Sequence, residues 1–501
     1  MKGFVELLQH QFDQNAGKPA ILYHNDVVTY SQLHNKAAKV GHLLQQKGFE
    51  QGDRVVLFTP DKLALLITHL GIILSGGVSL PLNFGFTEDE MLYFLNDSGA
   101  RFVFASGRQA ELVTRIKDRC PNLVDVLDPT EAIERGGSSK IGETSLSMED
   151  GCFMLYSSGT TGRPKGVVHT QENLAASLLA LQACWKFTAD DVLLNVLPLF
   201  HIHGLSFAAH LSLISGSTML LEDKFHPLKT MDVVSDATVF MAVPTIYYAF
   251  LRRGEFREKA TTWSRTRLFT CGSAPLQSDV LPELESILNK PLINRYGMTE
   301  SHVITSLPLD GPHPQGSVGV PLDGIDMKLV TEDNRSIPAS ALGKNDIDVV
   351  GEVKIRGKNL FHGYWKDPDS TVGAFDQDGY FSTGDLGHFD EHGCLTLVGR
   401  KKDLVIIDGY NVYPAVVERV LNSFAQVKEC AVIGLPDPRR GEKVVAVVVP
   451  ESELNETELK ALCKAKLADY QVPAQFEFAE ALPRNAMGKV LKRELRDELS
   501  K

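Results

Sequence analysis

The stretch from Tyr156 to Gly166 constrains this chain more than any other part of its sequence. Its eleven residues hold three glycines, four serine or threonine hydroxyls and two cations. The apolar runs on either side, 152–156 and 167–169, predict two strands joined by a glycine-rich turn. Such a turn leaves successive backbone N–H groups free, and these groups form a concavity that binds anions. We therefore expect a polyphosphate ligand, with a flexible surface turn as the alternative.

The pattern differs from the common phosphate-binding loop, which opens a helix. Here Arg163 and Pro164 follow Gly162, and a strand is expected after them. The stretch resembles instead the phosphate-binding signature of the adenylate-forming superfamily, which contains acyl-CoA synthetases, the adenylation domains of peptide synthetases and firefly luciferase. The resemblance implies that ATP binds here, and the residues that it assigns to nucleotide binding are Ser157, Ser158, Gly159, Thr160, Thr161, Gly162 and Lys165.

Composition and charge indicate a multidomain globular chain and exclude some classes of protein. At 501 residues the chain is long enough for more than one domain, and its net charge of −12 argues against a general nucleic-acid-binding protein. Its seven cysteines form no C-x-x-C pair, so neither a zinc site nor a disulfide framework is expected. Their odd number fits a reducing compartment, and the N-terminus lacks the apolar region of a signal peptide. We therefore expect a cytoplasmic protein.

Apolar strands alternate with helical segments of ten or more residues through most of the chain, which favours an α/β fold with parallel layers. The longest uncharged apolar stretch, 204–221, is predicted to be a buried helix, a turn and a strand instead of a transmembrane segment. We predict a large N-terminal domain, 1–399, of layered α/β subdomains with a β subdomain near 316–355. The charged break 400–403 is predicted to be a hinge, and 404–501 a small mobile α+β C-terminal domain.

The segment 294–300 is expected to follow a strand, and it combines an aromatic ring, a hydroxyl and a carboxylate. Tyr296 can stack on a base, and Thr299 can donate to a phosphate. Glu300 can hold Mg²⁺, which takes one or two carboxylates together with phosphate oxygens. The alternative is a loop whose tyrosine belongs to the core. The segment resembles the Y-G-x-T-E motif of the superfamily, which places Tyr296 and Gly297 at the nucleotide and gives Thr299 and Glu300 catalytic roles.

Further segments resemble other nucleotide-binding motifs of the same superfamily. Asp385, at the end of 379–385, would accept hydrogen bonds from both ribose hydroxyls, because a carboxylate has free lone pairs. The preceding segment, 376–379, hints weakly at a calcium loop, but we expect a hairpin turn there. The loop that lies along the adenine in the family is resembled by Gly272, Ser273 and Ala274. The arginine that reaches the nucleotide in the family is resembled by Arg400.

The last part of the chain resembles the mobile domain of the superfamily. Lys402 stands where the family has its hinge residue. Gly409 and Tyr410 fall in the loop that forms the thiol channel, where a glycine lets a pantetheine arm pass close to the backbone. The family more often has a small residue in place of Asp408. Lys489 falls in the P-x-x-x-x-G-K motif, and the resemblance implies that this lysine stabilises charge while a carboxylate attacks the α-phosphate of ATP.

The resemblance covers essentially the whole chain and implies a two-step ligase. A carboxylate attacks the α-phosphate of MgATP to give an acyl-adenylate and pyrophosphate, and the thiol of coenzyme A then attacks the acyl carbon and releases AMP. A rotation of the small domain about Lys402 would serve the two steps in turn. Three alternatives stay open: an enzyme that loads an acyl carrier protein, a luciferase-like oxygenase, and a non-catalytic nucleotide-binding protein.

The acyl pocket is expected near 199–205 and 241–245, and its candidate residues are His201, His203, Met241 and Arg295. His201 is also a candidate catalytic residue. The arginine before the Y-G-x-T-E motif, with His-x-His-Gly-Leu upstream, is similar to malonyl-CoA synthetases, and an arginine fork is the natural partner of a second carboxylate. We therefore expect a short dicarboxylate such as malonate or methylmalonate. The alternative is a fatty-acid or aryl-acid substrate, with Arg295 paired to an internal acid.

Overall fold

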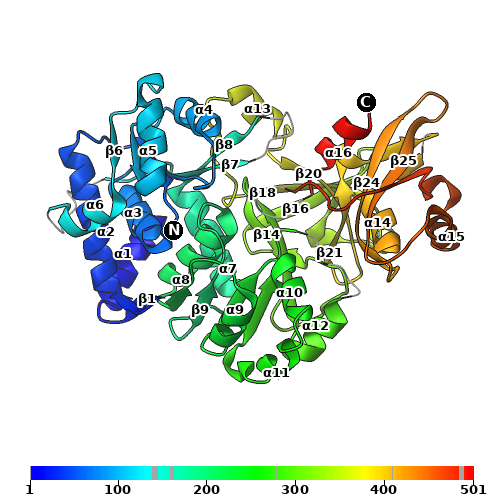
Figure 1. The fold of residues 1–501 in the computed structure, drawn as a ribbon, viewed down its shortest axis with the longest axis horizontal. Helices are drawn as coiled ribbons and strands as arrows, with labels where there is room; N and C mark the ends of the chain where they lie inside the picture. The colour runs from blue at the N-terminus through cyan, green and yellow to red at the C-terminus, as the bar shows by residue number, and fades with distance from the viewer. Residues whose placement is uncertain are drawn as a thin grey trace.

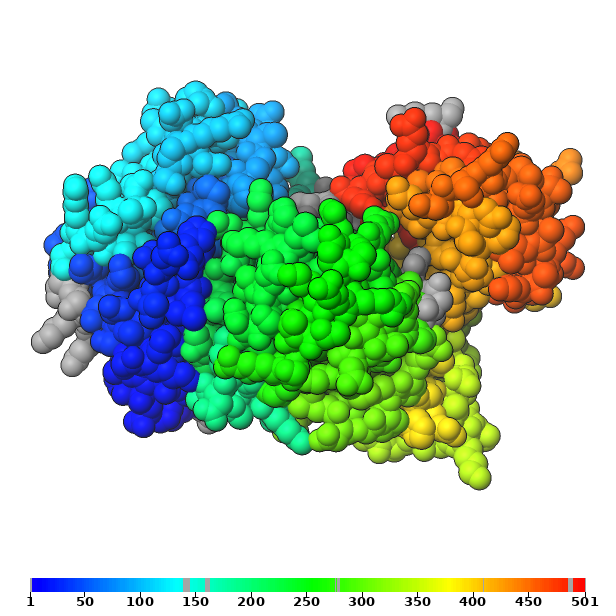
Figure 2. All heavy atoms as spheres, turned by 60° about the horizontal axis from the view of Figure 1, so that its bottom comes forward, coloured from blue at the N-terminus to red at the C-terminus, as the bar shows by residue number. Residues whose placement is uncertain are grey.

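The structure is a computed structural model that describes residues 2–137, 145–157, 163–274, 276, 280–408, 410–484 and 490–500. Figure 1 shows a large part that runs from the N-terminus to the yellow segments and a smaller orange and red part at the C-terminus. In Figure 2 the smaller part forms a separate lobe against the green and yellow-green surface of the larger one. The predicted α/β class is confirmed.

The largest sheet has nine strands and supplies the strand that carries Arg295 and Tyr296. Its central strands pair in parallel, whereas hairpins at its two edges pair antiparallel. In order across the sheet the strands are β15 (Val320–Pro321), β14 (His302–Ser306), β13 (Leu292–Met298), β12 (Leu268–Cys271), β11 (Val239–Ala242), β9 (Val192–Asn195), β10 (Thr218–Leu221), β1 (Pro19–Tyr23) and β2 (Asp26–Thr29).

A second sheet of seven strands holds the glycine-rich stretch. Strands β7 and β8 flank that stretch and pair antiparallel, as the apolar runs on either side of it predict. Across the sheet the strands are β19 (Gly363–Tyr364), β8 (Lys165–Thr170), β7 (Gly151–Ser157), β4 (Val78–Pro81), β3 (Arg54–Phe58), β5 (Phe102–Ala105) and β6 (Asp125–Leu127).

Two smaller sheets complete the fold. The first is the predicted β subdomain, and its strands are β17 (Ser336–Pro338), β16 (Ile325–Val330), β18 (Gly351–Gly357), β20 (Phe381–Phe389) and β21 (Leu395–Arg400). The second contains only strands from the C-terminal part, namely β23 (Tyr410–Val412), β22 (Val405–Ile407), β25 (Gly441–Pro450), β24 (Val427–Asp437) and β26 (Gln475–Phe478). The domain limits placed at 399 and 404 stay a prediction.

Helices cover both large sheets and pack on both faces of the C-terminal sheet (Figure 1). Among the helices in the described ranges, none has the length and apolar character needed to cross a bilayer. The helices are α1 (Phe4–Gln14), α2 (Tyr30–Gln46), α3 (Lys62–Leu74), α4 (Glu88–Ser98), α5 (Gly107–Ile116), α6 (Pro129–Arg135), α7 (Gln171–Cys184), α8 (Leu211–Ile214), α9 (Pro227–Val234), α10 (Pro244–Leu251), α11 (Phe256–Ala260), α12 (Leu281–Leu288), α13 (Pro368–Gly373), α14 (Pro414–Asn422), α15 (Glu456–Lys466) and α16 (Lys492–Leu499).

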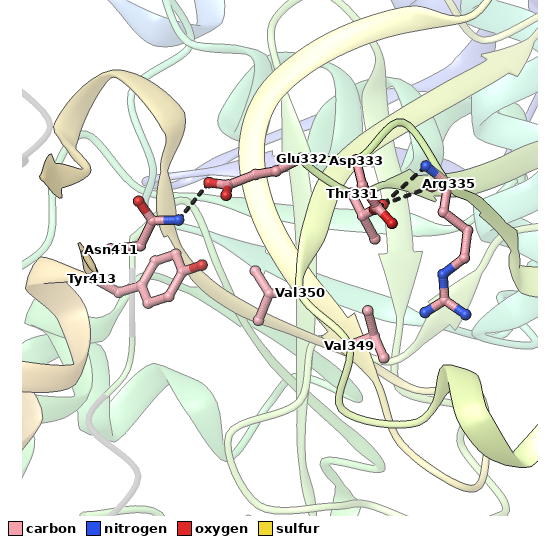
Figure 3. Close-up of a pocket in the computed structure, with 8 residues that line it drawn as sticks. All are labelled: Thr331, Glu332, Asp333, Arg335, Val349, Val350, Asn411 and Tyr413. Carbon is pink, nitrogen blue, oxygen red and sulfur yellow. Dashed lines mark hydrogen bonds between the residues drawn. The ribbon is translucent and has the colours of Figure 1, made fainter. Parts of the chain in front are cut away.

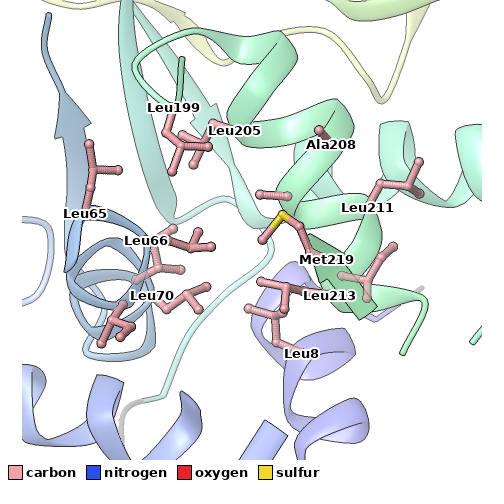
Figure 4. Close-up of a cluster of buried hydrophobic side chains, with 14 of the residues drawn as sticks. Leu8, Leu65, Leu66, Leu70, Leu199, Leu205, Ala208, Leu211, Leu213 and Met219 are labelled. Carbon is pink, nitrogen blue, oxygen red and sulfur yellow. The ribbon is translucent and has the colours of Figure 1, made fainter. Parts of the chain in front are cut away.

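The main hydrophobic core fixes the segment that carries His203 (Figure 4). The expected helix, turn and strand over 204–221 are present, but the first helix, His203–His210, is a π-helix, a rare form that is frequent at functional sites. Leu205 and Ala208 of this helix are fully buried, as is Leu66 of α3. Each fully buried leucine stabilises the fold by about 1.5–3 kcal/mol, so the core holds the π-helix firmly.

A group of buried histidines lies in the same core around the ring of Phe153. The rings of His69, His169, His210 and His302 all lie within 6.4 Å of it, centroid to centroid. Burial lowers the pKa of His69 to about 3 and that of His169 to about 4, and it holds the pKa values of His210 and His302 well below 6.5. These rings are therefore neutral at physiological pH.

The buried neutral histidines predict that acid weakens the fold. Because the folded pKa of His69 is depressed to about 3, the unfolded chain binds its proton first as the pH falls below 6.5. The free energy of unfolding is then expected to fall by about 1.4 kcal/mol per pH unit for each such group. Urea unfolding of the wild type from about pH 7 to about pH 5 measures this slope.

The variant His69→Leu provides the comparison. The variant lacks one titrating group, so its unfolding free energy is expected to decrease less steeply as the pH falls, by about 1 kcal/mol per pH unit. This expectation does not depend on how stable the variant is at neutral pH. Parallel curves for the wild type and the variant would contradict this assignment.

Candidate functional site

The β7–β8 hairpin brings the start of the glycine-rich stretch to the turn after β13. Ser157 Oγ donates to Glu300 Oε1 at 3.0 Å. Lys165 Nζ lies 3.1 Å from Asp367 Oδ2 and also contacts Ser370 Oγ, so the charge of this lysine has a carboxylate partner. The predicted phosphate-binding residues Ser158, Gly159, Thr160, Thr161 and Gly162 lie outside the described residues.

The motif around Tyr296 lies within a strand, whereas the sequence led us to expect it after one. Strand β13 continues to Met298 because it pairs antiparallel with β14 through that residue. A Cβ atom at Gly297 would lie 2.1 Å from the His302 carbonyl oxygen, so only glycine fits this close approach of the two backbones. The motif glycine therefore has a steric role in the β13–β14 hairpin.

Glu300 is a buried carboxylate at the tip of that hairpin. Its side chain accepts from Ser157 and, at 3.4 Å, from the Tyr364 hydroxyl, and burial raises its pKa. Among the described residues no group of three or more His, Cys, Asp or Glu side chains converges on a point that can hold a metal. A single carboxylate fits Mg²⁺, which keeps waters and substrate phosphate oxygens as its other ligands. Glu300 is thus the residue that would hold the ion.

Asp385 joins three parts of the chain at the predicted ribose position. Its side chain accepts from the Tyr296 hydroxyl at 2.6 Å and lies 3.0 Å from Arg400 Nε. Asp385 and Arg400 are directly paired across β20 and β21. Both Asp385 and Tyr296 are buried, so the carboxylate is held in a low-dielectric position by a hydroxyl and a guanidinium. The stacking of Tyr296 on a base stays a prediction.

The nearby segment 376–379 forms the expected turn and not a calcium loop. The backbone N–H of Asp376 donates to the Tyr380 carbonyl, and Gly379 has a φ of +78° that suits glycine. The carboxylate of Asp376 pairs with Lys354 and Lys328, which compensate its charge. This turn positions β20, the strand that carries Asp385.

Arg295 is the least compensated charge in this region. Its side chain is 3% exposed, and among the described residues no carboxylate lies within ion-pair distance of it. Its Nη2 donates to Ser273 Oγ at 3.4 Å, its guanidinium lies over the Phe207 ring at 4.7 Å, and its Nε has no partner in the described ranges. Burial lowers its pKa to about 10, which leaves it charged at neutral pH.

His203 of the π-helix lies close to this arginine, and His201 lies close to His203. His203 Nδ1 and Ser273 Oγ lie 3.2 Å apart, and within the described part of the chain the Nε2 atoms of His201 and His203 have no hydrogen-bond partner. Burial lowers the pKa of His201 to about 4, and burial together with the nearby Arg295 and His201 holds the pKa of His203 well below 6.5. The buried Arg295 and His203 thus lie together with unused hydrogen-bonding atoms, and the half-buried His201 next to His203 has another.

The structure places near Arg295 residues that the sequence reasoning did not assign to the acyl pocket. Ser273 was expected beside adenine, but its hydroxyl contacts both His203 and Arg295, and its φ of +70° places it in the left-handed region. Phe207 was not predicted as a site residue. It lies four residues after His203, a spacing that places two side chains on the same face of a helix, and this spacing is the signal that could have identified it. Ala274 follows Ser273 directly. Met241 is fully buried in the main core.

The predicted thiol-channel loop contacts the β subdomain in this structure. Tyr410 is exposed and stacks on Tyr470, and Asn411 Nδ2 contacts the Glu332 carboxylate. Figure 3 shows the pocket of about 440 Å³ that opens between Asn411 and Tyr413 on one side and the β16–β17 turn on the other. The residues that line it are Thr331, Glu332, Asp333, Arg335, Val349, Val350, Asn411 and Tyr413.

The predicted hinge residue Lys402 lies in a short 3₁₀ turn, Lys401–Asp403, directly after β21. Asp403 pairs with Arg496 of α16 at 2.7 Å, which ties the turn to the C-terminal part. The unusual Asp408 has a φ of +52°, and its carboxylate pairs with Arg440 at 2.7 Å. Gly409 and the predicted catalytic residue Lys489 lie outside the described residues.

Comparison with known proteins is consistent with this geometry. Residues 8–365 match the family model described as AMP-binding enzyme, and residues 416–489 match the model described as AMP-binding enzyme C-terminal domain. The malonate–CoA ligase of Arabidopsis thaliana is 31% identical over 94% of this chain and 84% of its own length. A long-chain-fatty-acid–CoA ligase of Bacillus subtilis is 30% identical over 96% of this chain and 92% of its own.

The solved structures extend the match to the whole fold. ATP-bound MatB from Rhodopseudomonas palustris superposes with a TM-score of 0.92 at 35% identity, over 100% of this chain and 99% of MatB. The apo form of the same protein superposes with a TM-score of 0.81. The matching family models, the relatives and the ATP-bound structure agree, and the chain therefore belongs to the AMP-binding enzyme family, as an AMP-forming acyl-CoA synthetase that uses ATP, Mg²⁺ and coenzyme A.

Proposed function

We propose that the acyl substrate of this ligase is a short dicarboxylate such as malonate or methylmalonate, and that Arg295 binds its distal carboxylate. The observation that carries the proposal is the buried, charged Arg295 without an ion-pair partner among the described residues. A buried charge is costly unless it is paired, and a bidentate guanidinium–carboxylate pair is the strongest form of such pairing. A substrate carboxylate supplies the missing partner.

The neighbours of Arg295 support this assignment. Ser273 Oγ lies within reach of both Arg295 and His203, and the unused Nε2 atoms of His201 and His203 can donate to a carboxylate oxygen in the tautomer that carries the proton there. A pocket with one cation and several neutral donors suits one additional carboxylate. It is a poor site for an unbranched alkyl chain, which leaves these donors unpaired.

A second candidate is a fatty or aromatic acid. The observation in its favour is the Phe207 ring, whose face lies 4.7 Å from the Arg295 guanidinium and partly compensates the charge. Relatives that act on different acids also match this chain, since one of them is named for long-chain fatty acids. We rank this candidate second, because a ring face does not satisfy the free Arg295 Nε.

In the proposed first step, the protein holds the reacting carboxylate in line with the α-phosphate of ATP and neutralises developing charge. Asp385 receives the ribose hydroxyls, Thr299 donates to a phosphate, and Arg400 and Lys489 supply positive charge. Ser157, Lys165 and the glycines and hydroxyls of 158–162 surround the phosphates. Mg²⁺, when bound by Glu300, supplies charge neutralisation at the phosphate oxygens.

In the proposed second step, the thiol of coenzyme A attacks the acyl carbon and AMP leaves. The loop with Gly409 and Tyr410 must approach the acyl-adenylate, and the contact of Asn411 with Glu332 must break for that to happen. Lys402 is the proposed hinge of this movement. A carrier-protein thiol in place of coenzyme A is an alternative acceptor, which a thiol-acceptor assay separates. The seven unpaired cysteine thiols agree with a proposed location in the cytoplasm.

The Arg295→Ala variant tests the dicarboxylate proposal. Pyrophosphate release with MgATP and CoA is measured for malonate, methylmalonate, acetate, octanoate, palmitate and 4-coumarate. The wild type is expected to prefer malonate or methylmalonate. The variant is expected to lose about 10²–10³ in kcat/KM for the dicarboxylates, because a buried charge-assisted pair is broken, and to change little for acetate.

The control is Arg295→Lys, which keeps the charge but not the planar fork, and it is expected to retain part of the dicarboxylate preference. A monocarboxylate that is the best substrate of the wild type, with a preference unchanged in Arg295→Ala, would reject the dicarboxylate proposal. That result would not affect the assignment of the protein as an acyl-CoA ligase, and it would favour a fatty-acid or aryl-acid substrate.

The Asp385→Asn variant tests the proposed ribose contact. It removes one negative charge from beside Arg400, and it replaces an acceptor-only group by an amide. The KM for ATP is expected to rise by about 10–100-fold, because hydrogen bonds to a charged group contribute about 1.5–3 kcal/mol each. Steady-state kinetics with varied ATP at a saturating acid concentration measure the change.

Tyr296→Phe is the matched control for Asp385→Asn. It removes the hydroxyl that donates to Asp385 at 2.6 Å but leaves the carboxylate in place. Its unfolding free energy is expected to fall by about 1–2 kcal/mol, whereas its KM for ATP should stay near the wild-type value. Equal KM values for all three proteins would remove Asp385 from the nucleotide site.

A further inference from the structure

The turn between β13 and β14 carries Thr299 and Glu300, the residues proposed to contact the phosphates and the metal. Its backbone carbonyl groups all have partners outside the turn, and these partners come from two other segments of the chain. Thr299 O accepts from His169 Nε2 at 2.7 Å, Glu300 O from Phe361 N at 2.8 Å, and Ser301 O from Asn359 Nδ2 at 2.7 Å. Only the first of these bonds comes from a titratable side chain.

The bond to the Thr299 carbonyl is the end of a buried chain of hydrogen bonds. His169 Nδ1 lies 3.1 Å from His302 Nε2, and His302 Nδ1 lies 3.2 Å from Ser206 Oγ. His169, His302 and Ser206 are completely buried. Ser206 belongs to the π-helix that also carries His203. The hydrogen bonds through Ser206, His302 and His169 therefore connect this helix with the Thr299–Glu300 turn. We call this series of hydrogen bonds the relay.

The direction of every bond in this chain follows from the carbonyl at its end. A carbonyl only accepts, so His169 carries its proton on Nε2. Both rings are completely buried and, among the described residues, neither has a carboxylate partner, so each ring carries a single proton. The Nδ1 of His169 is therefore an acceptor for the Nε2–H of His302. The Nδ1 of His302 in turn accepts the hydroxyl proton of Ser206.

The backbone of His302 indicates that its ring is present for a purpose other than folding the turn. Its φ of +57° lies in the left-handed region, where a side chain is strained and glycine is preferred. The neighbouring Gly297 leaves no room for the hairpin to relax, since its backbone packs against the His302 carbonyl. A bulky side chain nevertheless occupies this position, and it makes two of the three hydrogen bonds in the series.

We propose that His302 and His169 are positioning residues for the ligase reaction, which transmit the position of the π-helix to the Thr299 carbonyl and hold the Thr299–Glu300 turn against the nucleotide. Neither residue touches substrate in this assignment. The proposal rests on the proposed roles of Thr299 and Glu300, and it adds that their placement depends on a hydrogen-bonded side-chain relay reaching the acyl pocket. Loss of the relay is expected to impair adenylation more than folding.

The first variant to test is His169→Leu, which leaves the Thr299 carbonyl without its partner. We expect kcat for malonate-dependent pyrophosphate release to fall by about tenfold to a hundredfold, because a small misplacement of catalytic groups has effects of this size. The Mg²⁺ concentration for half-maximal rate is expected to rise, and the KM for malonate to change little. His169→Gln is the conservative variant, because its amide nitrogen takes the place of Nε2, and it is expected to restore most of the rate.

The matched control is His69→Leu. His69 is as deeply buried as His169, packs against the same Phe153 ring and bonds to Ser79 and His210, but it has no bond to the turn. It is expected to lower stability in the same way while leaving kcat and the Mg²⁺ dependence at wild-type values. Equal losses of rate in His69→Leu and His169→Leu, or a failure of His169→Gln to recover the rate, would overturn the proposal.

Glu300→Gln separates this inference from the proposed function. If Glu300→Gln abolishes activity and His169→Leu does not alter it, the turn is catalytic and the relay is not needed, so only the positioning inference fails. If Glu300→Gln is fully active, the proposed role of the turn fails as well. Both outcomes are read from the same pyrophosphate assay across a range of Mg²⁺ concentrations.

Nitrogen NMR of the wild-type enzyme, labelled with ¹⁵N in histidine, tests the relay without any substitution. Both His169 and His302 are expected in the Nε2–H tautomer, with unprotonated Nδ1 atoms and shifts that do not change between about pH 8 and about pH 6. The His302→Gln variant identifies the His302 signal. A proton on Nδ1 of either ring would reverse the deduced bond direction and overturn the relay even if the leucine variants failed to fold.

Discussion

The buried carboxylate of Asp385 is the interaction on which the arrangement of this molecule depends. It lies between the Tyr296 hydroxyl, on the largest sheet, and Arg400, the last residue of β21. Two residues beyond Arg400 the chain reaches Lys402, so one carboxylate joins the large sheet, the β subdomain and the connection to the C-terminal part. A buried ion pair contributes little net stability, but it is costly to break, and it therefore fixes the geometry of the chain next to the proposed hinge.

The fold was predictable because its signals are local, and the residues proposed for the nucleotide site also come from local motifs. The β7–β8 hairpin follows from two apolar runs around a glycine-rich turn, and the parallel sheets follow from the alternation of strands and helices. Arg295, Tyr296, Gly297, Thr299 and Glu300 are contiguous, so recognising one motif placed all five. The extension of β13 through the motif was missed, because it depends on pairing with β14, which begins at His302 after a turn that the sequence does not mark with glycine.

The buried group of histidines and the places of Ser273 and Phe207 beside Arg295 were not predictable, because they depend on contacts between residues that lie far apart in the sequence. His69, His169, His210 and His302 are isolated in sequence, and their convergence on Phe153 follows from the packing of α3, β8, β14 and the π-helix. The π-helix itself has no sequence signature, since its apolar residues also fit an ordinary α-helix. Ser273 was assigned from its motif to adenine, and only the fold brings its hydroxyl between His203 and Arg295.

If the proposed dicarboxylate pairs with Arg295, the amount of folded enzyme would also depend on the supply of that substrate. Without that substrate, Arg295 is a buried charge with no counter-ion among the described residues, a cost that the remainder of the fold must outweigh. A carboxylate that binds only the folded state removes that cost and adds stability in proportion to the logarithm of its concentration, about 2.7 kcal/mol at a hundred times its Kd. Differences of this size alter how long a marginally stable protein escapes proteolysis in a cell. The enzyme would thus persist where its substrate is plentiful and be cleared where it is scarce, without any dedicated regulatory site.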